Sequence, residues 1–184
     1  MKYTLDWESV DIDGRNVLTS DSGTQQLGVS VSTPENEKGA QWVVGFDAGD
    51  EDAIKDDPDT IRSSDVRKPT ELHVDFDREV TDLQFEVYDI DSGHNWDDKV
   101  TIVALDADGN ETTIKLSDLI HSHKVTGEGD DVPGITIEGE GAESVKVEGP
   151  GYPDSVAVSI AGPVSSLKFI HDNGHDVHIS GTVG

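Results

Sequence analysis

The sequence predicts an all-β domain, a two-sheet antiparallel β-sandwich that is jelly-roll-like and carries long acidic loops. Apolar and polar residues alternate along much of the chain, which puts the apolar side chains of each run on one face of a strand. Turn-forming residues separate these runs, and the 19 glycines suit many tight turns. Helical periodicity is nearly absent, and only "LSDLIH" (Leu116–His121) is compatible with one short helix.

The predicted strands follow one another at the spacing of a sandwich. In chain order they are Leu27–Thr33, Glu71–Phe76, Leu83–Ile90, Lys99–Leu105, Glu111–Leu116, Gly134–Gly139, Ser144–Gly149, Ser155–Ile160, Ser166–His171 and Asp176–Gly181. "DADGN" (Asp106–Asn110) places Asp-Gly between two of them, which predicts a hairpin turn. "PGYPDS" (Pro150–Ser155) and "AGPV" (Ala161–Val164) indicate later turns. Two sheets packed face to face would bury the apolar faces.

The length of 184 residues favours a single domain spanning 1–184, large enough to bury a core. Met1 is followed at once by strand-like sequence and Gly184 ends such a sequence, so we expect a domain excised from a larger protein. The longest stretch without a strand signal is Asp47–Pro69, and irregular stretches of this length are usually functional or disordered.

The chain is strongly acidic, with 39 Asp and Glu against 13 Lys and Arg and a net charge of −26. This balance argues against nucleic acid and anionic membrane surfaces as partners, because both require a basic face. No apolar run is long enough for membrane insertion. Self-repulsion on this scale destabilises a compact state, so we expect bound cations or a salty environment to offset it. The absence of cysteine excludes disulfides and thiolate chemistry.

The segment "YDIDSGHNWDDKV" (Tyr88–Val100) concentrates oxygen donors between two predicted strands. Calcium takes six to eight oxygen ligands in flexible geometry, and such a loop could wrap one ion. The candidate ligands are Asp89, Asp91, Asn95, Asp97 and Asp98. It is not an EF-hand, because the sixth and twelfth positions from Asp89 are His94 and Val100 rather than Gly and Glu. The alternative is a solvated acidic loop.

A second acidic cluster lies within Asp47–Asp59, and its candidate calcium ligands are Asp47, Asp50 and Asp52. The alternative there is a disordered, solvated loop. "DADGN" also resembles part of a calcium loop, but the hairpin turn is the favoured interpretation.

The C-terminal "HDNGHDVH" offers three histidines, but His175 and His178 differ by an odd number and would face opposite sides of a straight strand, which disfavours zinc. Asp172 in this segment reads either as part of a turn or as a further calcium ligand.

Two long segments together resemble a sandwich domain of bacterial secreted and surface proteins: "FEVYDIDSGHNWDDKVTIVALDADGNETTIKL" and "VAVSIAGPVSSLKFIHDNG". The resemblance covers about Leu72–Asn173. Within that group, the acidity and the missing cysteines look most like the calcium-dependent peptide-binding domain of giant RTX adhesins. The family pattern matches at Asp89, Asp91, Asp97 and Asp98 in the acidic loop and at Asp172 in the last motif.

The resemblance implies an extracellular module on a bacterial cell surface, next to other domains of the same adhesin. Calcium would rigidify the fold and help to form a groove for short peptide ends on a target cell, with a terminal carboxylate as one candidate group. The expected ligand contacts are Trp96, His94, Asp91 and His171, although Trp96 could instead pack over the loop. Alternatives are a glycan-binding, lectin-like module and a calcium-rigidified structural spacer. We expect no enzyme, because the chain lacks a G-x-S-x-G elbow and a cysteine nucleophile.

Overall fold

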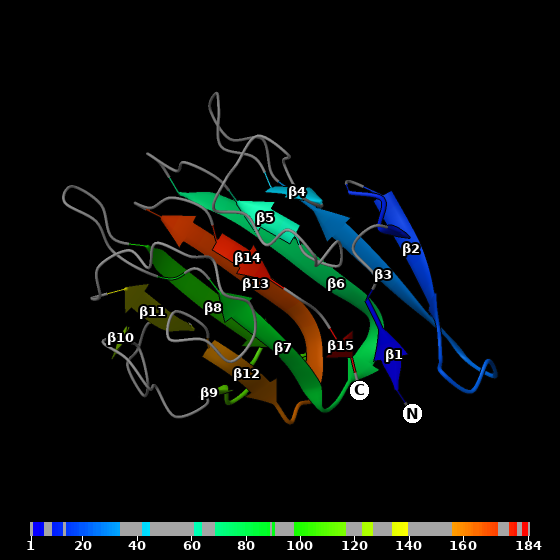
Figure 1. Ribbon diagram of the computed structural model, residues 1–184. Coiled ribbons are helices and arrows are strands. Elements are labelled where there is room, and N and C mark those ends of the chain that lie inside the picture. Colours follow the sequence, from blue (N-terminus) through cyan, green and yellow to red (C-terminus); the bar gives the residue numbers. More distant parts are fainter. Residues whose placement is uncertain are drawn as a thin grey trace.

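The computed structural model confirms an all-β sandwich, in which every regular element of the described residues is a strand (Figure 1). The structure describes residues 2–5, 9–12, 14–33, 42–44, 61–63, 69–88, 90, 98–116, 123–126, 134–139, 156–172, 177–179 and 182–183. No helix in this part of the chain could cross a membrane.

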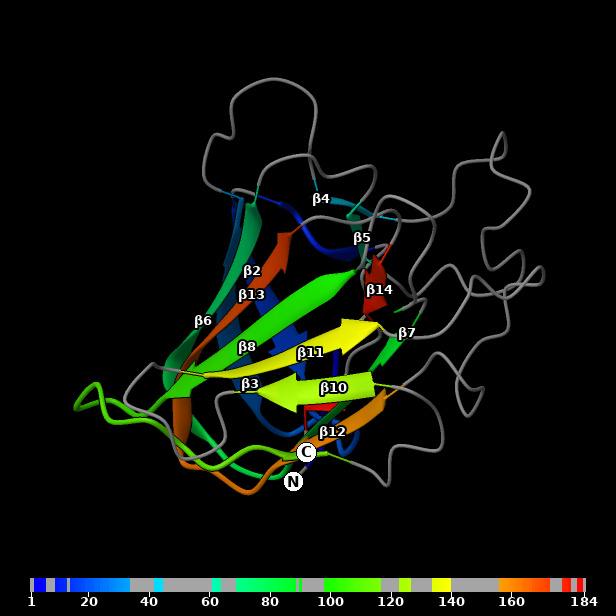
Figure 2. The same ribbon diagram turned by 90° about the vertical axis from the view of Figure 1, so that its left-hand side faces the viewer.

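One sheet contains seven of the described strands in the order β10-β11-β8-β13-β6-β3-β2 (Figure 2). Every neighbouring pair in it is antiparallel. Its strands are β2 (Gly14–Thr19), β3 (Gln26–Ser32), β6 (Thr70–Val80), β8 (Lys99–Leu105), β10 (His123–Thr126), β11 (Ile135–Gly139) and β13 (Val164–Asp172).

The other sheet contains eight described strands and is also antiparallel. Its strands are β1 (Tyr3–Thr4), β4 (Trp42–Val44), β5 (Ile61–Ser63), β7 (Leu83–Tyr88), β9 (Lys115–Leu116), β12 (Val156–Ile160), β14 (Val177–Ile179) and β15 (Thr182–Val183). β7 lies at the centre: it pairs with β12 along one edge and with β14 and β15, one after the other, along the second edge. β1 then pairs with β15, so the first and last described strands lie side by side.

The strand order of the two sheets is that of a jelly roll. Eight strands form two four-stranded layers, β5-β14-β7-β12 and β6-β13-β8-β11, and the remaining strands extend the two sheets. The chain alternates between the layers from β5 to β8 and again from β11 to β14. This double Greek-key wrapping is the arrangement expected for such a fold.

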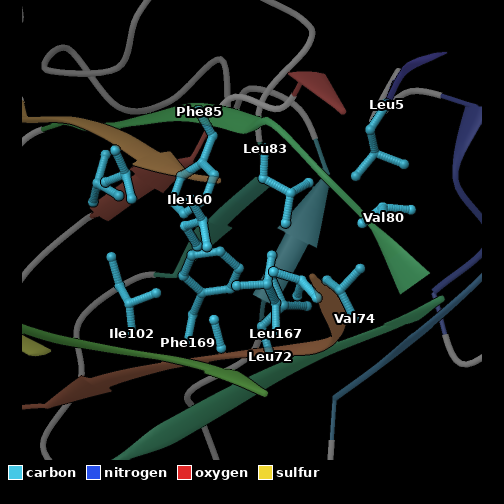
Figure 3. Close-up of a cluster of buried hydrophobic side chains, with 14 of the residues drawn as sticks. Leu5, Leu72, Val74, Val80, Leu83, Phe85, Ile102, Ile160, Leu167 and Phe169 are labelled. Atoms are coloured by element: carbon cyan, nitrogen blue, oxygen red, sulfur yellow. The ribbon is translucent and has the colours of Figure 1, made fainter. Parts of the chain in front are cut away.

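The core lies between the two layers, where apolar side chains from both sheets meet (Figure 3). Phe85 of β7 and Phe169 of β13 touch across it, with ring centroids 5.2 Å apart in an edge-to-face arrangement. Both rings are nearly fully buried. Each fully buried large apolar side chain contributes about 1.5–3 kcal/mol, so the alternating strands supply the main stabilising term.

The predicted strands are largely found where the alternation placed them. Lys99–Leu105 is β8, and Ser155–Ile160 is β12 shortened by one residue. Glu111–Leu116 differs: it makes a single bridge from Glu111 back to Leu105, and then only Lys115–Leu116 is a strand, paired with β12 of the other sheet. The predicted hairpin at "DADGN" therefore closes as a turn but does not continue as a ladder. Leu116, where the short helix was expected to begin, is a strand residue, and the rest of that segment, like Ser144–Gly149, lies outside the described residues.

The strand directions give the sandwich two distinct ends. At one end β6 begins, β7 ends, β8 begins and β13 ends, and we call the residues Thr70, Ile90, Asp98, His171 and Asp172 there the acidic rim. At the opposite end, the turn rim, the chain reverses at Thr81–Asp82, Asp106–Asn110 and Ala161–Pro163.

Candidate functional site

A fully buried Asp–His pair lies at the acidic rim. His171 Nε2 is 3.0 Å from Asp98 Oδ1, and both side chains are 0% exposed. Asp98 immediately precedes β8, and His171 is the penultimate residue of β13. The antiparallel register places His171 beside Val100 of β8 and Thr70 of β6. Two segments that sequence analysis singled out separately are thus joined by a direct contact.

The alternation of the two strands explains why both side chains point inward. His171 continues the inward series of β13 after Leu167 and Phe169, and Asp98 lies two residues before inward-facing Val100. A polar side chain at such a position loses its water and needs a hydrogen-bonding partner. The His171 ring and the Asp98 carboxyl group satisfy each other through this hydrogen bond, in which the tautomer of His171 sets the direction.

The Asp172 side chain points to the opposite face of the seven-stranded sheet from the Asp98 side chain. It pairs in register with Lys99, whose ammonium lies 3.4 Å from Glu138 on the outer face of the seven-stranded sheet. Successive residues of a strand face opposite sides, so Asp172 is outward while its neighbour His171 is inward. The two predicted calcium ligands Asp98 and Asp172 are therefore close along the rim, but this register does not direct them at one common ion.

Most of the predicted site lies outside the described residues. This applies to the loop candidates Asp89, Asp91, His94, Asn95, Trp96 and Asp97 and to the second cluster Asp47, Asp50 and Asp52. Within the described part of the chain, no three His, Asp or Glu side chains gather closely enough to hold a metal ion. Asp98 supplies one inward carboxylate there, so a calcium site at this position would take its other oxygens from residues 89–97.

His171, predicted as a ligand contact, is completely buried and bonded to Asp98. In this structure it supports the rim from inside rather than presenting its ring at the surface.

The acidic side chains of the turn rim accept hydrogen bonds from backbone amides. Asp106 Oδ1 accepts hydrogen bonds from the amides of Asp108 and Asn110 at 2.9 and 2.8 Å, and Oδ2 accepts one from the side chain of Asn110 at 3.1 Å. The hydrogen bonds from the Asn110 side chain and backbone lower the pKa of Asp106 below its usual value of 3.8. Glu79 accepts from the amide of Ala107 at 2.9 Å. These bonds agree with the interpretation of "DADGN" as a turn, because both carboxylate oxygens of Asp106 already accept hydrogen bonds within it.

Glu111 is a turn-rim residue that sequence analysis did not single out. Its carboxylate accepts the amide proton of Gly134, at the start of β11. Arg78 was missed as well: its guanidinium donates to the Tyr3 hydroxyl at 3.0 Å and to the Gln26 carbonyl, and so joins the two sheets. No local signal marks either residue, because the partners are far away in the sequence.

The aromatic side chains that the structure describes all lie in the core: Tyr3, Phe76, Phe85 and Phe169. None of them forms a surface platform of the kind that stacks on sugars or bases.

Comparison with protein-family models, with curated proteins and with solved structures finds no match for this chain.

Proposed function

We propose that the protein is a calcium-dependent, non-catalytic ligand-binding module of a bacterial surface adhesin, and that it takes up short peptide ends at the acidic rim. The observation that carries the proposal is the convergence at this rim. Lys99, which directly follows the acidic segment 89–98, pairs with Asp172 at the end of β13, and Asp98 bonds to a residue 73 positions away. The jelly roll thus brings Asp98 and Asp172, from two different acidic motifs, to one end of the sandwich.

Calcium would supply the positive charge that the rim lacks. In this proposal Asp98 and the loop donors Asp89, Asp91, Asn95 and Asp97 hold the ion. An ion with an open coordination position can accept the carboxylate of a peptide end, and so an acidic protein can bind an anionic group. The direct ligand contacts are then Trp96, His94 and Asp91, and buried His171 is not one of them.

A glycan ligand is the second candidate. Sugar-binding sandwiches use exposed aromatic rings, and the four aromatic side chains whose burial the structure describes, those of Tyr3, Phe76, Phe85 and Phe169, are all buried. A glycan site would therefore depend on Trp96 and on other aromatic residues beyond these four. A structural spacer stiffened by calcium is the third candidate.

The experiment is a peptide and glycan array probed in millimolar calcium and again with chelator. Peptide signals that chelation abolishes are expected. Sugar-only signals would replace the proposal by a carbohydrate-binding module. If calcium stabilises the protein but the array gives neither peptide nor glycan signals, the structural spacer is the remaining candidate.

Calcium dependence is tested separately by thermal unfolding. An ion that binds only the folded state at a hundredfold excess over its Kd stabilises by about 2.7 kcal/mol. For a domain of this size, that raises Tm by about 5–11 °C. Asp89→Ala should remove much of this shift. Asp108→Ala, which removes one exposed carboxylate from the turn rim, is the matched control and should leave it in place. Equal Tm values of the wild type in calcium and in chelator would overturn the calcium site.

A further inference from the structure

We propose that the free edge of β2 is an interface between two copies of this chain. In this dimer the β2 strands of both copies pair antiparallel about a two-fold axis at Val17, so that the two seven-stranded sheets become one continuous sheet. No residue of the acidic rim takes part in the pairing, and the dimer is therefore independent of the proposed calcium site.

The outer edge of β2 carries backbone groups that no other strand of the described chain uses. β2 ends the seven-stranded sheet, with β3 as its neighbour there (Figure 1). The amide of Ser20 donates to the Gln25 carbonyl at 2.8 Å, so the pairing with β3 continues in register beyond Thr19. In an antiparallel ladder, successive residues direct their amide and carbonyl groups alternately toward and away from the neighbouring strand. Arg15, Val17 and Thr19 therefore direct these groups outward.

The two ends of this free edge define its centre. The amide of Asp21, the next outward position, already donates to the Lys2 carbonyl at 3.0 Å. At the other end the chain turns at Asp11, whose carbonyl accepts the amide of the first β2 residue at 3.3 Å. The edge that a second chain can reach is therefore residues 15–19, and its midpoint is Val17.

Pairing about this midpoint makes the edge complementary to itself. Val17 lies opposite Val17 of the second copy, and Arg15 lies opposite Thr19 of the second copy. All these positions direct their backbone groups outward, so each opposite pair exchanges both of its amide–carbonyl hydrogen bonds. No two like charges lie directly opposite each other, which would destabilise the pairing. A two-fold axis is also the commonest symmetry of protein dimers.

The Val17 side chain supplies the apolar contact of the interface. It is 57% exposed, and no other large apolar side chain in the described part of the chain is exposed to this extent. Its partner across the β2–β3 ladder is Gly28, which has no side chain to cover it. The space over Gly28 is filled by Asp77, whose Oδ2 would lie 2.6 Å from an added Cβ. Val17 of the second copy is the missing neighbour, and burial of both side chains stabilises the dimer.

β2 has few of the features by which edge strands avoid pairing. It contains no proline and no lysine, and its register with β3 is continuous without a bulge. Its single charge is Arg15, which lies 3.9 Å from Asp77 of the same copy. The strand itself thus brings no carboxylate into the interface. The net charge of −26 on each copy still opposes association, so screening by salt should strengthen the dimer.

The first test measures the mass by sedimentation equilibrium, with chelator present so that calcium cannot bridge two copies. The wild type should approach twice the monomer mass as its concentration rises. It should do so at lower concentration in 1 M than in 0.1 M KCl, because the screening length falls from about 10 Å to about 3 Å.

Variants of Val17 test the interface. Val17→Pro removes an amide that the β3 ladder does not use, so the fold should remain and the dimer should be lost. Val17→Lys places a charge at the same exposed position and should also give a monomer, and it decides the question if the proline variant does not fold. Val17→Thr is the matched control, because it keeps a β-branched side chain and should still dimerise.

The register is tested by cysteine substitution, which is clean because the chain contains no cysteine. Directly opposite residues of such a pair have Cα atoms about 5.5 Å apart, within the range of a disulfide. Val17→Cys should therefore give a covalent dimer under mild oxidation. Thr19→Cys is the control: it lies opposite Arg15 of the second copy and should crosslink far less. Combining Arg15→Cys with Thr19→Cys should restore the crosslink.

Three results would overturn this interface. The first is a wild type that stays monomeric at every concentration in 1 M KCl, which would leave the β2 edge to an extended segment of another protein. The second is a dimer that persists in both Val17→Lys and Val17→Pro. The third is equal crosslinking of Val17→Cys and Thr19→Cys.

Discussion

Gly134 offers a sharp test of how β11 joins β8. It adopts a φ of 98°, and a Cβ atom added there would lie 2.6 Å from the Ile102 carbonyl oxygen and 2.7 Å from Val103 Cγ2. Gly109 has a similar φ of 83° but nothing within 4 Å of an added Cβ. Gly109→Ala therefore measures the cost of the left-handed backbone by itself, about 1–2 kcal/mol. Gly134→Ala adds overpacking against a central strand, about 1–3 kcal/mol more.

The assay is urea and thermal unfolding of both variants at one calcium concentration. The additional cost should place the Tm of Gly134→Ala about 2–12 °C below that of Gly109→Ala, at about 2–4 °C per kcal/mol. The m-value should be unchanged, because both variants unfold from the same compact state. If the two variants lose the same stability, the close approach of Gly134 to the β8 backbone is incorrect.

Two further predictions concern charge. Asp106→Asn should destabilise the protein at neutral pH, because the lowered pKa of Asp106 contributes stability that is present above pH 3.8 and is lost as pH falls through the folded-state value. Urea unfolding at pH 7 and pH 3 measures the free energy of unfolding of Asp106→Asn and of Asp108→Asn, the control for one lost charge. The difference between the two variants should be smaller at pH 3 than at pH 7. An equal difference at both pH values would contradict this explanation. With chelator present, raising KCl from 0.1 to 1 M should raise Tm, because a net charge of −26 repels itself and the screening length shrinks from about 10 Å to about 3 Å. A flat or falling Tm would show that this repulsion does not limit stability.

The strands that the sequence located best are those with a buried partner on both sides. β8 coincides with its predicted range, and β13 extends its prediction by only a few residues. β2, "GRNVLT", was not predicted, because an edge strand with one neighbour alternates only between half-buried and exposed positions. The strand predicted at Glu111–Leu116 folds back on β8 only at the Glu111–Leu105 bridge, and its last two residues form β9, which pairs with β12 of the other sheet.

The sequence likewise predicted only part of the candidate site. The sequence singled out Asp98 and His171, because oxygen donors and histidines in short connections are visible locally. It assigned them to an ion and to a ligand respectively. Their contact depends on the register of β13 against β8, which no local pattern contains.

Composition and period-2 alternation by themselves determined the all-β class, the two-sheet sandwich and the excess of negative charge, because each is a property of neighbouring residues. Tertiary structure alone decided which strands are adjacent, that Asp98 and Asp172 lie at the same end of the sandwich, and which way Asp98, His171 and Asp172 point. The physical reason is that strand order follows from burying two apolar faces against each other. That requirement joins residues far apart in the chain, and through it His171, predicted as a ligand contact, is buried inside the fold.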